Sequence, residues 1–298
     1  MNITNKLNLP SVLVDTVGRR YNPDKNVISC TQLVDSPLIR RLTIEHWSEL
    51  SIDVSDEIWK IVGSAVHFII EKIKTKNVLK EEYLKVKEGD MTLTGMFDLY
   101  EEDGSLSDFK FTSVWTKVYE SRIKDWERQL NVYAYLLSKH NFPVSKTQII
   151  AIYRDWSKTK ANEQGSDYPK HQAEIIPVQL WKPEVREKYI KKRLRLHTQE
   201  YDTYRCNSDE RWQSQKEYKI IKKGYKRSRK NVSTLQEAKK FKEEQSDKDK
   251  LDIIKIPAKY KRCAGYCQVA EFCPLLKEER GGGQNVREDN SGIGAVAR

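Results

Sequence analysis

The spacing of apolar residues predicts two amphipathic helices in the first half of the chain. Residues 55–76 carry apolar side chains every three or four positions, at Ile58, Ile61, Val62, Ala65, Ile69 and Ile73. Residues 114–140 carry a second stripe, at Trp126, Leu130, Tyr133, Ala134 and Leu137. A further long helix, which is strongly basic, is predicted over residues 182–204.

Between the two amphipathic helices the pattern changes to an alternation that is typical of strands. Residues 81–88 alternate and end at Gly89-Asp90, a turn signal. Residues 91–113 predict two further strands joined at Asp103-Gly104, a dipeptide typical of tight hairpins. Residues 147–156 indicate a buried strand. The order helix, three strands, helix, strand predicts an α/β (α+β) domain with a mixed central sheet flanked by helices.

The C-terminal third has a different organisation. Residues 206–262 contain a hairpin turning near Gly224, a helix opened by the capping-box pair Thr234 and Glu237, and a closing strand, which predicts a small basic ββαβ appendage. We expect residues 1–205 to form the main domain. Residues 263–280 are cysteine-rich and are predicted to pack on that domain, and residues 281–298 form a glycine-rich tail that we expect to be disordered.

Charge is concentrated in one part of the chain. The net charge is +11, and residues 182–262 alone hold 26 Lys and Arg against 13 Asp and Glu. Such a region favours a polyanion partner, most often nucleic acid, although a solvated lysine-rich surface explains it equally well. Residues 216–230 hold eight basic residues and one acid, with Tyr218 and Tyr225 between them, a composition that suits a nucleic-acid track.

Two further features concern location. No apolar run approaches the ~20 residues that a membrane span needs. The first residues lack the charged-then-apolar pattern of a signal peptide. We therefore expect a cytoplasmic protein without a membrane partner.

Four short segments carry candidate chemistry, in order along the first domain. They are Gly63–His67 on the first helix, Gly95–Asp98 and Asp108–Lys110 on the two arms of the hairpin, and Gln129–Tyr133 on the second helix. Asp98 and Asp108 lie on adjacent strands, so their carboxylates can converge, and converging carboxylates repel unless a cation lies between them. Carboxylate oxygens suit Mg²⁺ or Mn²⁺, and a nitrogen ligand from His67 favours Mn²⁺.

The remaining residues of these segments complete a possible active site. Lys110, two positions after Asp108, can orient a water molecule or stabilise developing negative charge. Gln129 and Tyr133 share one helix face and can hold the lysine or a DNA strand. Glu71, one turn after His67, is a further acid nearby. Each residue alone has an ordinary structural explanation, as a packed histidine or a solvated ion pair; their combined order and spacing favour a site.

The segments GSAVH, TGMFD, DFKFT and QLNVY resemble, in that order, the motifs of the PD-(D/E)xK nuclease superfamily. The match covers residues 30–155 and looks most similar to the RecB-type exonuclease branch, which includes phage and CRISPR-associated exonucleases. The resemblance implies a restriction-endonuclease-like core. It also implies metal ligation by His67, Asp98, Asp108 and the backbone carbonyl of Phe109, a catalytic Lys110, and support from Gln129 and Tyr133.

The resemblance further implies a Mg²⁺- or Mn²⁺-dependent deoxyribonuclease. We expect an exonuclease that hydrolyses DNA phosphodiester bonds in recombination, repair or phage DNA processing and leaves a 5′-phosphate. DNA is then the principal partner, and a recombinase, a helicase or a single-strand-binding protein are the protein partners that such a role suggests. The alternative is a non-catalytic DNA-binding accessory protein on the same scaffold.

The cysteines indicate a second metal or cluster. Three lie close together, at Cys263, Cys267 and Cys273, a spacing that can place three thiolates around one centre. RecB-type nucleases often carry a [4Fe–4S] cluster, which the resemblance implies here, although three residues rather than two separate the first pair. Cys206 in its polar segment is our favoured fourth ligand. Cys30 is the alternative, since the relatives' distant cysteine precedes the nuclease motifs.

Other interpretations of the cysteines remain open. Zinc held by four thiolates is the main rival to iron–sulfur, and unligated thiols are the third possibility. A cluster-bearing regulator that senses redox state is a further hypothesis for the function.

Overall fold

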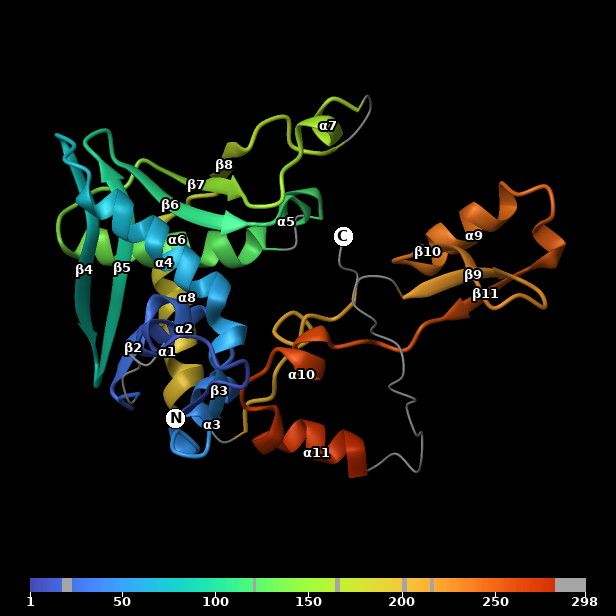
Figure 1. Cartoon of the computed structure of the whole chain (residues 1–298), viewed down its shortest axis with the longest axis horizontal. Helices are drawn as coiled ribbons and strands as arrows, with labels where there is room; N and C mark the ends of the chain where they lie inside the picture. The colour runs from blue at the N-terminus through green and yellow to red at the C-terminus, as the bar shows by residue number, and fades with distance from the viewer. Residues whose placement is uncertain (18–22, 120–121, 164–166, 200–202, 215–216, 282–298) are drawn as a thin grey trace. The chain divides into compact units, whose positions relative to one another are not determined.

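The computed structural model describes residues 1–17, 23–119, 122–163, 167–199, 203–214 and 217–281 (Figure 1). The chain divides into two compact units, Met1–Tyr204 and Arg205–Arg298. The division lies one residue before the boundary at 205/206 that the sequence suggests. Residues 263–280 belong to the second unit, and their packing against the first stays a prediction. Of the glycine-rich tail 281–298, for which we expect disorder, Gly281 is the last residue of a helix and residues 282–298 lie outside the described residues.

The first unit is built around a mixed six-stranded sheet, which confirms the predicted fold class (Figure 1). The strand order is β2-β5-β6-β7-β8. The remaining strand, β4, pairs along the whole length of β5. The pairs β2–β5 and β6–β7 are parallel, whereas β4–β5, β5–β6 and β7–β8 are antiparallel. The strands are β2 (Val27–Ser29), β4 (Val78–Glu88), β5 (Met91–Glu101), β6 (Ser105–Thr112), β7 (Lys146–Tyr153) and β8 (Ala173–Val178).

The helices of this unit cover both faces of the sheet. The helix α6 packs across β4 to β8, and α4 contacts β4 and β6. Lys110 contacts α6 while the next residue, Phe111, contacts α4, so the two helices lie on opposite faces. The helices are α1 (Ser11–Val17), α2 (Cys30–Val34), α3 (Pro37–Glu45), α4 (Ile58–Lys72), α5 (Val114–Val118), α6 (Ile123–Lys139), α7 (Lys158–Ala161) and α8 (Pro183–Thr198).

A short strand pair and a 3₁₀-helix lie next to the start of α4. The strands β1 (Asn2–Thr4) and β3 (Ser51–Asp53) form a separate parallel pair. The 3₁₀-helix η1 (Val54–Glu57) follows, and the Asp53 carboxylate caps it by accepting the Ser55 amide. The helix α4 therefore begins later than the sequence pattern suggests.

The prediction of one long helix over residues 114–140 is wrong. The structure has two helices there, α5 and α6. The start of α5 is fixed by Asp155, which accepts hydrogen bonds from the Ser113 hydroxyl and the Val114 amide. The buried face of α6 begins only at Trp126, so the apolar stripe that we used belongs to α6 alone.

The helix α4 differs from α6 in its burial. The apolar periodicity correctly predicts a helix, but none of its residues is fully buried. Trp59, Phe68 and Ile69 are each more than half exposed, at 58%, 57% and 60%. The helix α4 thus leaves much of its apolar surface open to water.

The second unit contains a three-stranded antiparallel sheet with the order β10-β9-β11. Its small core comprises Ile220, Val232, Ala238 and Leu251. The basic hairpin and the helix opened by Thr234 lie in the predicted ββαβ order. The elements are β9 (Tyr218–Lys222), β10 (Ser228–Val232), α9 (Leu235–Glu243), η2 (Lys248–Lys250), β11 (Leu251–Lys255), α10 (Lys261–Gly265), η3 (Ala270–Phe272) and α11 (Pro274–Gly281).

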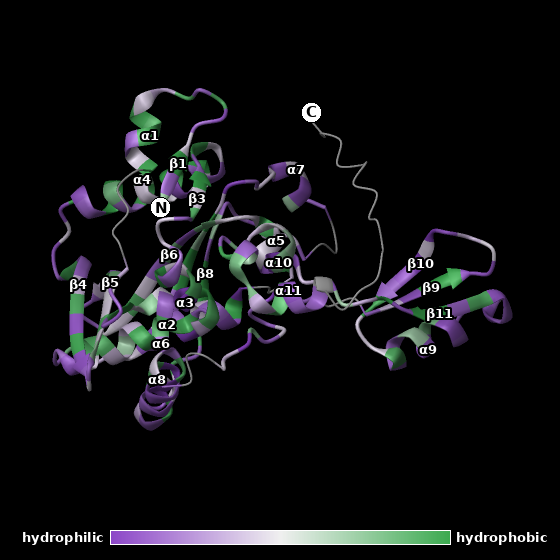
Figure 2. Ribbon diagram, turned by 90° about the horizontal axis from the view of Figure 1, so that it is seen from below, coloured by the Kyte–Doolittle hydropathy of each residue, from purple (hydrophilic) through white to green (hydrophobic). Residues whose placement is uncertain are grey.

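The helix α8 differs in composition from the buried helix α6. Figure 2 shows α8 as mainly hydrophilic, and its few buried positions include Ile190, Leu194 and His197. Among the described helices, none is both long and apolar enough to cross a bilayer.

Candidate functional site

The candidate site lies where β5 and β6 part. These strands pair only through Leu99–Ser107 and Tyr100–Leu106, and the same register continued would set Asp98 opposite Asp108. Instead, Asp98 Oδ2 accepts a hydrogen bond from the Phe109 amide at 2.7 Å. The carboxylate thus binds β6 immediately beyond Asp108, and the two acids converge as the hairpin pattern predicts.

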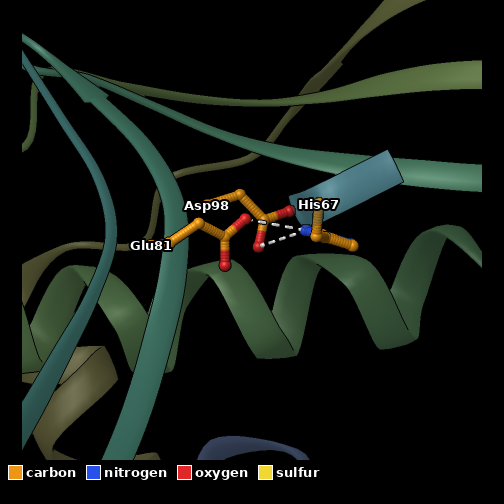
Figure 3. Close-up of side chains that lie close together, drawn as sticks. All are labelled: His67, Glu81 and Asp98. Atoms are coloured by element: carbon orange, nitrogen blue, oxygen red, sulfur yellow. Dashed lines mark hydrogen bonds and ion pairs between the residues drawn. The ribbon is translucent and has the colours of Figure 1, made fainter. Parts of the chain in front are cut away.

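Three side chains converge at this point from three elements (Figure 3). His67 Nδ1 on α4 lies 2.9 Å from Glu81 Oε1 on β4 and 3.5 Å from Asp98 Oδ1 on β5. Their donor atoms all lie within 4.8 Å of one another, and no other such group of three occurs among the described residues. The two carboxylates are buried, while the imidazole is about one-third exposed.

Glu81 is the member of this group that the sequence interpretation missed. The turn at Gly89-Asp90 pairs Glu88 with Met91, and counting back along β4 from that pair sets Glu81 opposite Asp98. The signal was therefore present in the hairpin register. Glu81 has a positive φ of 51°, a conformation that costs a non-glycine residue free energy and that recurs at active sites and ligand clamps.

Glu71, which the sequence suggested as a further acid, lies elsewhere. Its side chain is exposed and its carboxylate pairs with the neighbouring Lys72 at 3.0 Å. Glu81 thus takes the place beside His67 that we considered for Glu71.

A second set of side chains surrounds Asp108. Its Oδ2 forms an ion pair with Lys110 Nζ at 2.6 Å. Gln129 on α6 accepts a hydrogen bond from Lys110 Nζ at 3.3 Å and donates to Asp108 Oδ1 at 3.4 Å. The same amide donates to the Tyr133 hydroxyl at 3.1 Å. The four predicted residues therefore form one connected network.

The main chain of Phe109 faces the same region. In a strand, the amide and the carbonyl of one residue point to the same side. Because the Phe109 amide donates to Asp98, we expect its carbonyl to point towards β5 as well. This orientation fits the ligand role that the resemblance implies for that carbonyl.

Burial and charge raise the pKa of Asp98 to about 7. Desolvation is the main cause, and the nearby Asp108 carboxylate adds to it; His67, the Phe109 amide and Lys110 oppose the shift. Burial also raises the pKa of Tyr133 far above its ordinary value, so its hydroxyl stays protonated. Asp98 is thus a carboxylate that lacks a sufficient positive partner.

The donor set fits a divalent cation. Carboxylate oxygens with one imidazole nitrogen are ligands that Mn²⁺ accepts, and Mg²⁺ accepts the oxygens. A cation would also offset the repulsion between Asp98 and Asp108 that contributes to the raised pKa. The residues present therefore match the chemistry of the predicted metal.

The cysteines are distributed between the two units. Cys30 is 1% exposed in the core of the first unit, where burial raises the pKa of its thiol. Cys206, Cys263, Cys267 and Cys273 all belong to the second unit. The pKa of Cys267 is raised, first by burial and also by its neighbours Cys263 and Cys273. Their donor set suits iron–sulfur or zinc, although no three of the described thiols form a group as close as His67, Glu81 and Asp98.

Comparisons with known proteins give partial likenesses of structure only. No family model matches this chain, and no curated protein matches it. Among solved structures, SSO0001 is 17% identical, with a TM-score of 0.39, over 62% of this chain and 82% of its own. A phage-related exonuclease from Haemophilus somnus 129PT is 13% identical, with a TM-score of 0.37, over 61% of this chain and 95% of its own. The alkaline exonuclease LHK-Exo from Laribacter hongkongensis is 10% identical, with a TM-score of 0.36, over 60% and 91%.

Proposed function

We propose that this protein is a Mg²⁺- or Mn²⁺-dependent deoxyribonuclease of the RecB-type PD-(D/E)xK kind, acting as an exonuclease in recombination, repair or phage DNA processing. The observation that carries the proposal is the juxtaposition of His67, Glu81 and Asp98 with the Asp108–Lys110–Gln129 network. A divalent cation beside a positioned lysine is one arrangement that can catalyse phosphodiester hydrolysis, since both stabilise negative charge on the phosphate. The motif resemblance supports the choice of DNA as substrate.

The residues of the site have separate tasks in this reaction. A bound divalent cation would polarise the phosphate and make a bound water more acidic. We expect His67, Asp98, Asp108 and the Phe109 carbonyl to hold it, as the resemblance implies, with Glu81 as a further ligand beside His67 and Asp98. Lys110 Nζ, fixed by Asp108 and Gln129, is placed to orient the attacking water or to stabilise the negative charge that develops on the phosphate oxygens. Tyr133 fixes Gln129 in turn, so that the lysine keeps its direction.

Cleavage of end-labelled DNA in the presence of Mn²⁺ tests the proposal. We expect wild type to release nucleotides, and Asp108→Ala and Lys110→Ala each to lose at least about 100-fold in rate, because such groups contribute roughly 10²- to 10⁴-fold. Lys85→Ala, an exposed lysine on β4, is the matched control and should cut like wild type. Equal cleavage by all four proteins would refute the assignment. Tight DNA binding without cleavage would favour a non-catalytic accessory protein.

We also propose that Cys206, Cys263, Cys267 and Cys273 hold a [4Fe–4S] cluster, with Zn²⁺ as the alternative. The presence of all four in one unit supports Cys206 over Cys30 as the fourth ligand. Iron, sulfide and zinc analysis of anaerobically purified protein distinguishes the two cofactors. We expect Cys206→Ser to lower the metal content and Cys30→Ser to leave it unchanged; the reverse pattern would make Cys30 the ligand.

A further inference from the structure

An aromatic side chain near the candidate site is exposed and yet held in place. Trp59 of α4 is 58% exposed. Its ring lies 6.4 Å from the ring of Phe111, and the guanidinium of Arg154 lies over it at 4.4 Å. Arg154 is exposed as well. The structure therefore presents an indole whose orientation is fixed on two sides while much of its surface remains open to water.

This group, which we call the Trp59 platform (Trp59, Phe111 and Arg154), is tied to the candidate active site by three elements. Trp59 and His67 are eight residues apart on α4, so they lie about 12 Å apart along the helix axis and roughly 80° apart around it. Phe111 follows Lys110 on β6. Arg154 follows β7, and its amide donates to the Thr112 carbonyl at the end of β6. The platform thus lies at the carboxyl ends of the parallel strands β6 and β7, where α/β sheets bind ligands.

The helix surface between the platform and His67 is bare. Gly63 lies midway between Trp59 and His67, and a Cβ atom added there would have no atom within 4 Å. Backbone without a side chain leaves room for a ligand to pass along α4 from the ring to the imidazole. At about 3.4 Å per stacked nucleotide, 12 Å corresponds to three or four nucleotides.

More aromatic and cationic side chains continue beyond β6. Trp115 stacks on Tyr119 with ring centroids 5.8 Å apart, and both are exposed, at 45% and 64%. Lys160 Nζ lies 5.9 Å from the centre of the Trp115 ring. Exposed rings interleaved with cations are the composition of surfaces that stack unpaired bases and attract phosphates.

We propose that the Trp59 platform stacks an unpaired base of a nucleic-acid strand whose phosphate reaches the His67–Asp98 site. The substrate class is then a single strand or a frayed end rather than the interior of a paired duplex, because only an unpaired base exposes the face that a ring can stack on. The guanidinium of Arg154, which lies over the indole, holds the orientation of the ring. It also adds a positive charge that attracts the adjoining phosphate. This inference rests on the proposed nuclease function, but its binding test does not.

Binding of fluorescein-labelled dodecathymidylate, measured by fluorescence anisotropy in EDTA, tests the platform without any cleavage. The same oligonucleotide with abasic residues three or four positions from one end keeps every phosphate and removes the stacked base. We expect wild type to bind the abasic form about 5- to 100-fold more weakly, the range that loss of one stacked base produces. A blunt duplex of equal length should bind more weakly than the single strand.

Two variants and a control identify the ring responsible. Trp59→Ala should bind the natural oligonucleotide more weakly by the same factor, and it should bind the natural and abasic oligonucleotides equally well. Trp59→Phe should keep most of the affinity and most of the preference for the natural oligonucleotide. Tyr83→Ala removes a ring of matched exposure, 61%, on β4 and should bind like wild type. Because Trp59 is exposed, these substitutions should leave the fold intact.

The outcomes separate this inference from the nuclease proposal. Equal binding of natural and abasic oligonucleotides by wild type, or equal losses in Trp59→Ala and Tyr83→Ala, would overturn the platform. The expected binding pattern together with no cleavage in Mn²⁺ would overturn the nuclease function and leave the platform standing. If both hold, Trp59→Ala should also lose the preference of cleavage for single strands over blunt duplex.

Discussion

At the scale of the residue, Asp98 determines how the candidate site responds to pH. Its carboxyl group is buried, lies beside the like charge of Asp108, and has a pKa of about 7. A metal ligand must be deprotonated, so protons and cations compete for this group. The raised pKa means that the competition falls within the physiological pH range.

We therefore expect Mn²⁺ to bind roughly tenfold more weakly at pH 6 than at pH 8. A carboxyl group of pKa about 7 is mainly protonated at pH 6 and mainly ionised at pH 8, so affinity is lost as the pH falls through 7. Titration calorimetry with MnCl₂ at several pH values measures this dependence. In Asp108→Asn the repelling charge is gone, the pKa of Asp98 should fall, and the midpoint should move to lower pH. A midpoint that Asp108→Asn leaves in place would contradict this explanation.

At the scale of the element, the packing between β5 and α6 fixes the position of the acids relative to Gln129. Gly95 lies three residues before Asp98, and a Cβ atom there would lie 2.5 Å from Cys30 Sγ, 2.8 Å from Tyr133 Cε1 and 3.0 Å from Leu136 Cδ1. Only glycine allows β5 and α6 to approach this closely. Cys30, which packs against this position, is a member of the main hydrophobic core.

We expect Gly95→Ala to reduce the free energy of unfolding by about 1–3 kcal/mol, the usual range for overpacking a core. Urea denaturation measures the change. Gly63→Ala is the matched control: it meets nothing within 4 Å, and replacing a helical glycine should stabilise the protein by about 0.5–1 kcal/mol. Adding Cys30→Ala to Gly95→Ala should restore part of the loss. Equal effects of the two glycine substitutions would show that β5 and α6 are not closely packed.

The elements also show what the sequence could and could not predict. Period-two alternation identifies β4, β5 and β6, and the spacing of Asp98, Asp108, Lys110, Gln129 and Tyr133 correctly brings those side chains together. Glu81 was missed because the interpretation followed motif spacing rather than the register set by the turn at Gly89-Asp90. The break before α6 and the open face of α4 could not be predicted, since both depend on which tertiary contacts form.

At the scale of the whole molecule, the charge is unevenly distributed along the chain. The first unit holds the candidate site, and the second carries the basic hairpin formed by β9 and β10. Lys223, Lys226 and Arg227 lie at the tip of this hairpin and are exposed. We infer that they contribute to binding through the phosphates, without reading sequence.

Replacing Lys223, Lys226 and Arg227 together by Gln should make the salt dependence of DNA binding shallower. Removing one cation that binds a phosphate reduces the slope of log affinity against log salt concentration by about one, so the slope should fall by up to about three. The control replaces Lys74, Lys85 and Lys87, which are exposed in the first unit, and changes the net charge equally. Anisotropy at several salt concentrations measures both slopes. Equal changes in the two variants would mean that net charge alone, and not the hairpin, governs binding.

DNA cleavage by this protein should depend on a cation bound by His67, Glu81 and Asp98. The most direct test is the rate of cleavage of end-labelled DNA as a function of Mn²⁺ concentration, for wild type, Glu81→Gln and Glu82→Gln. Glu82 is the exposed neighbour on the same strand and serves as the control. We predict that the cleavage rate of Glu82→Gln depends on Mn²⁺ concentration as that of wild type does. Glu81→Gln should need an Mn²⁺ concentration at least about tenfold higher to reach half of its maximal rate, because one member of the cation site is lost. Identical Mn²⁺ dependence in the three proteins, or cleavage that proceeds without any divalent cation, would contradict this role of the three residues.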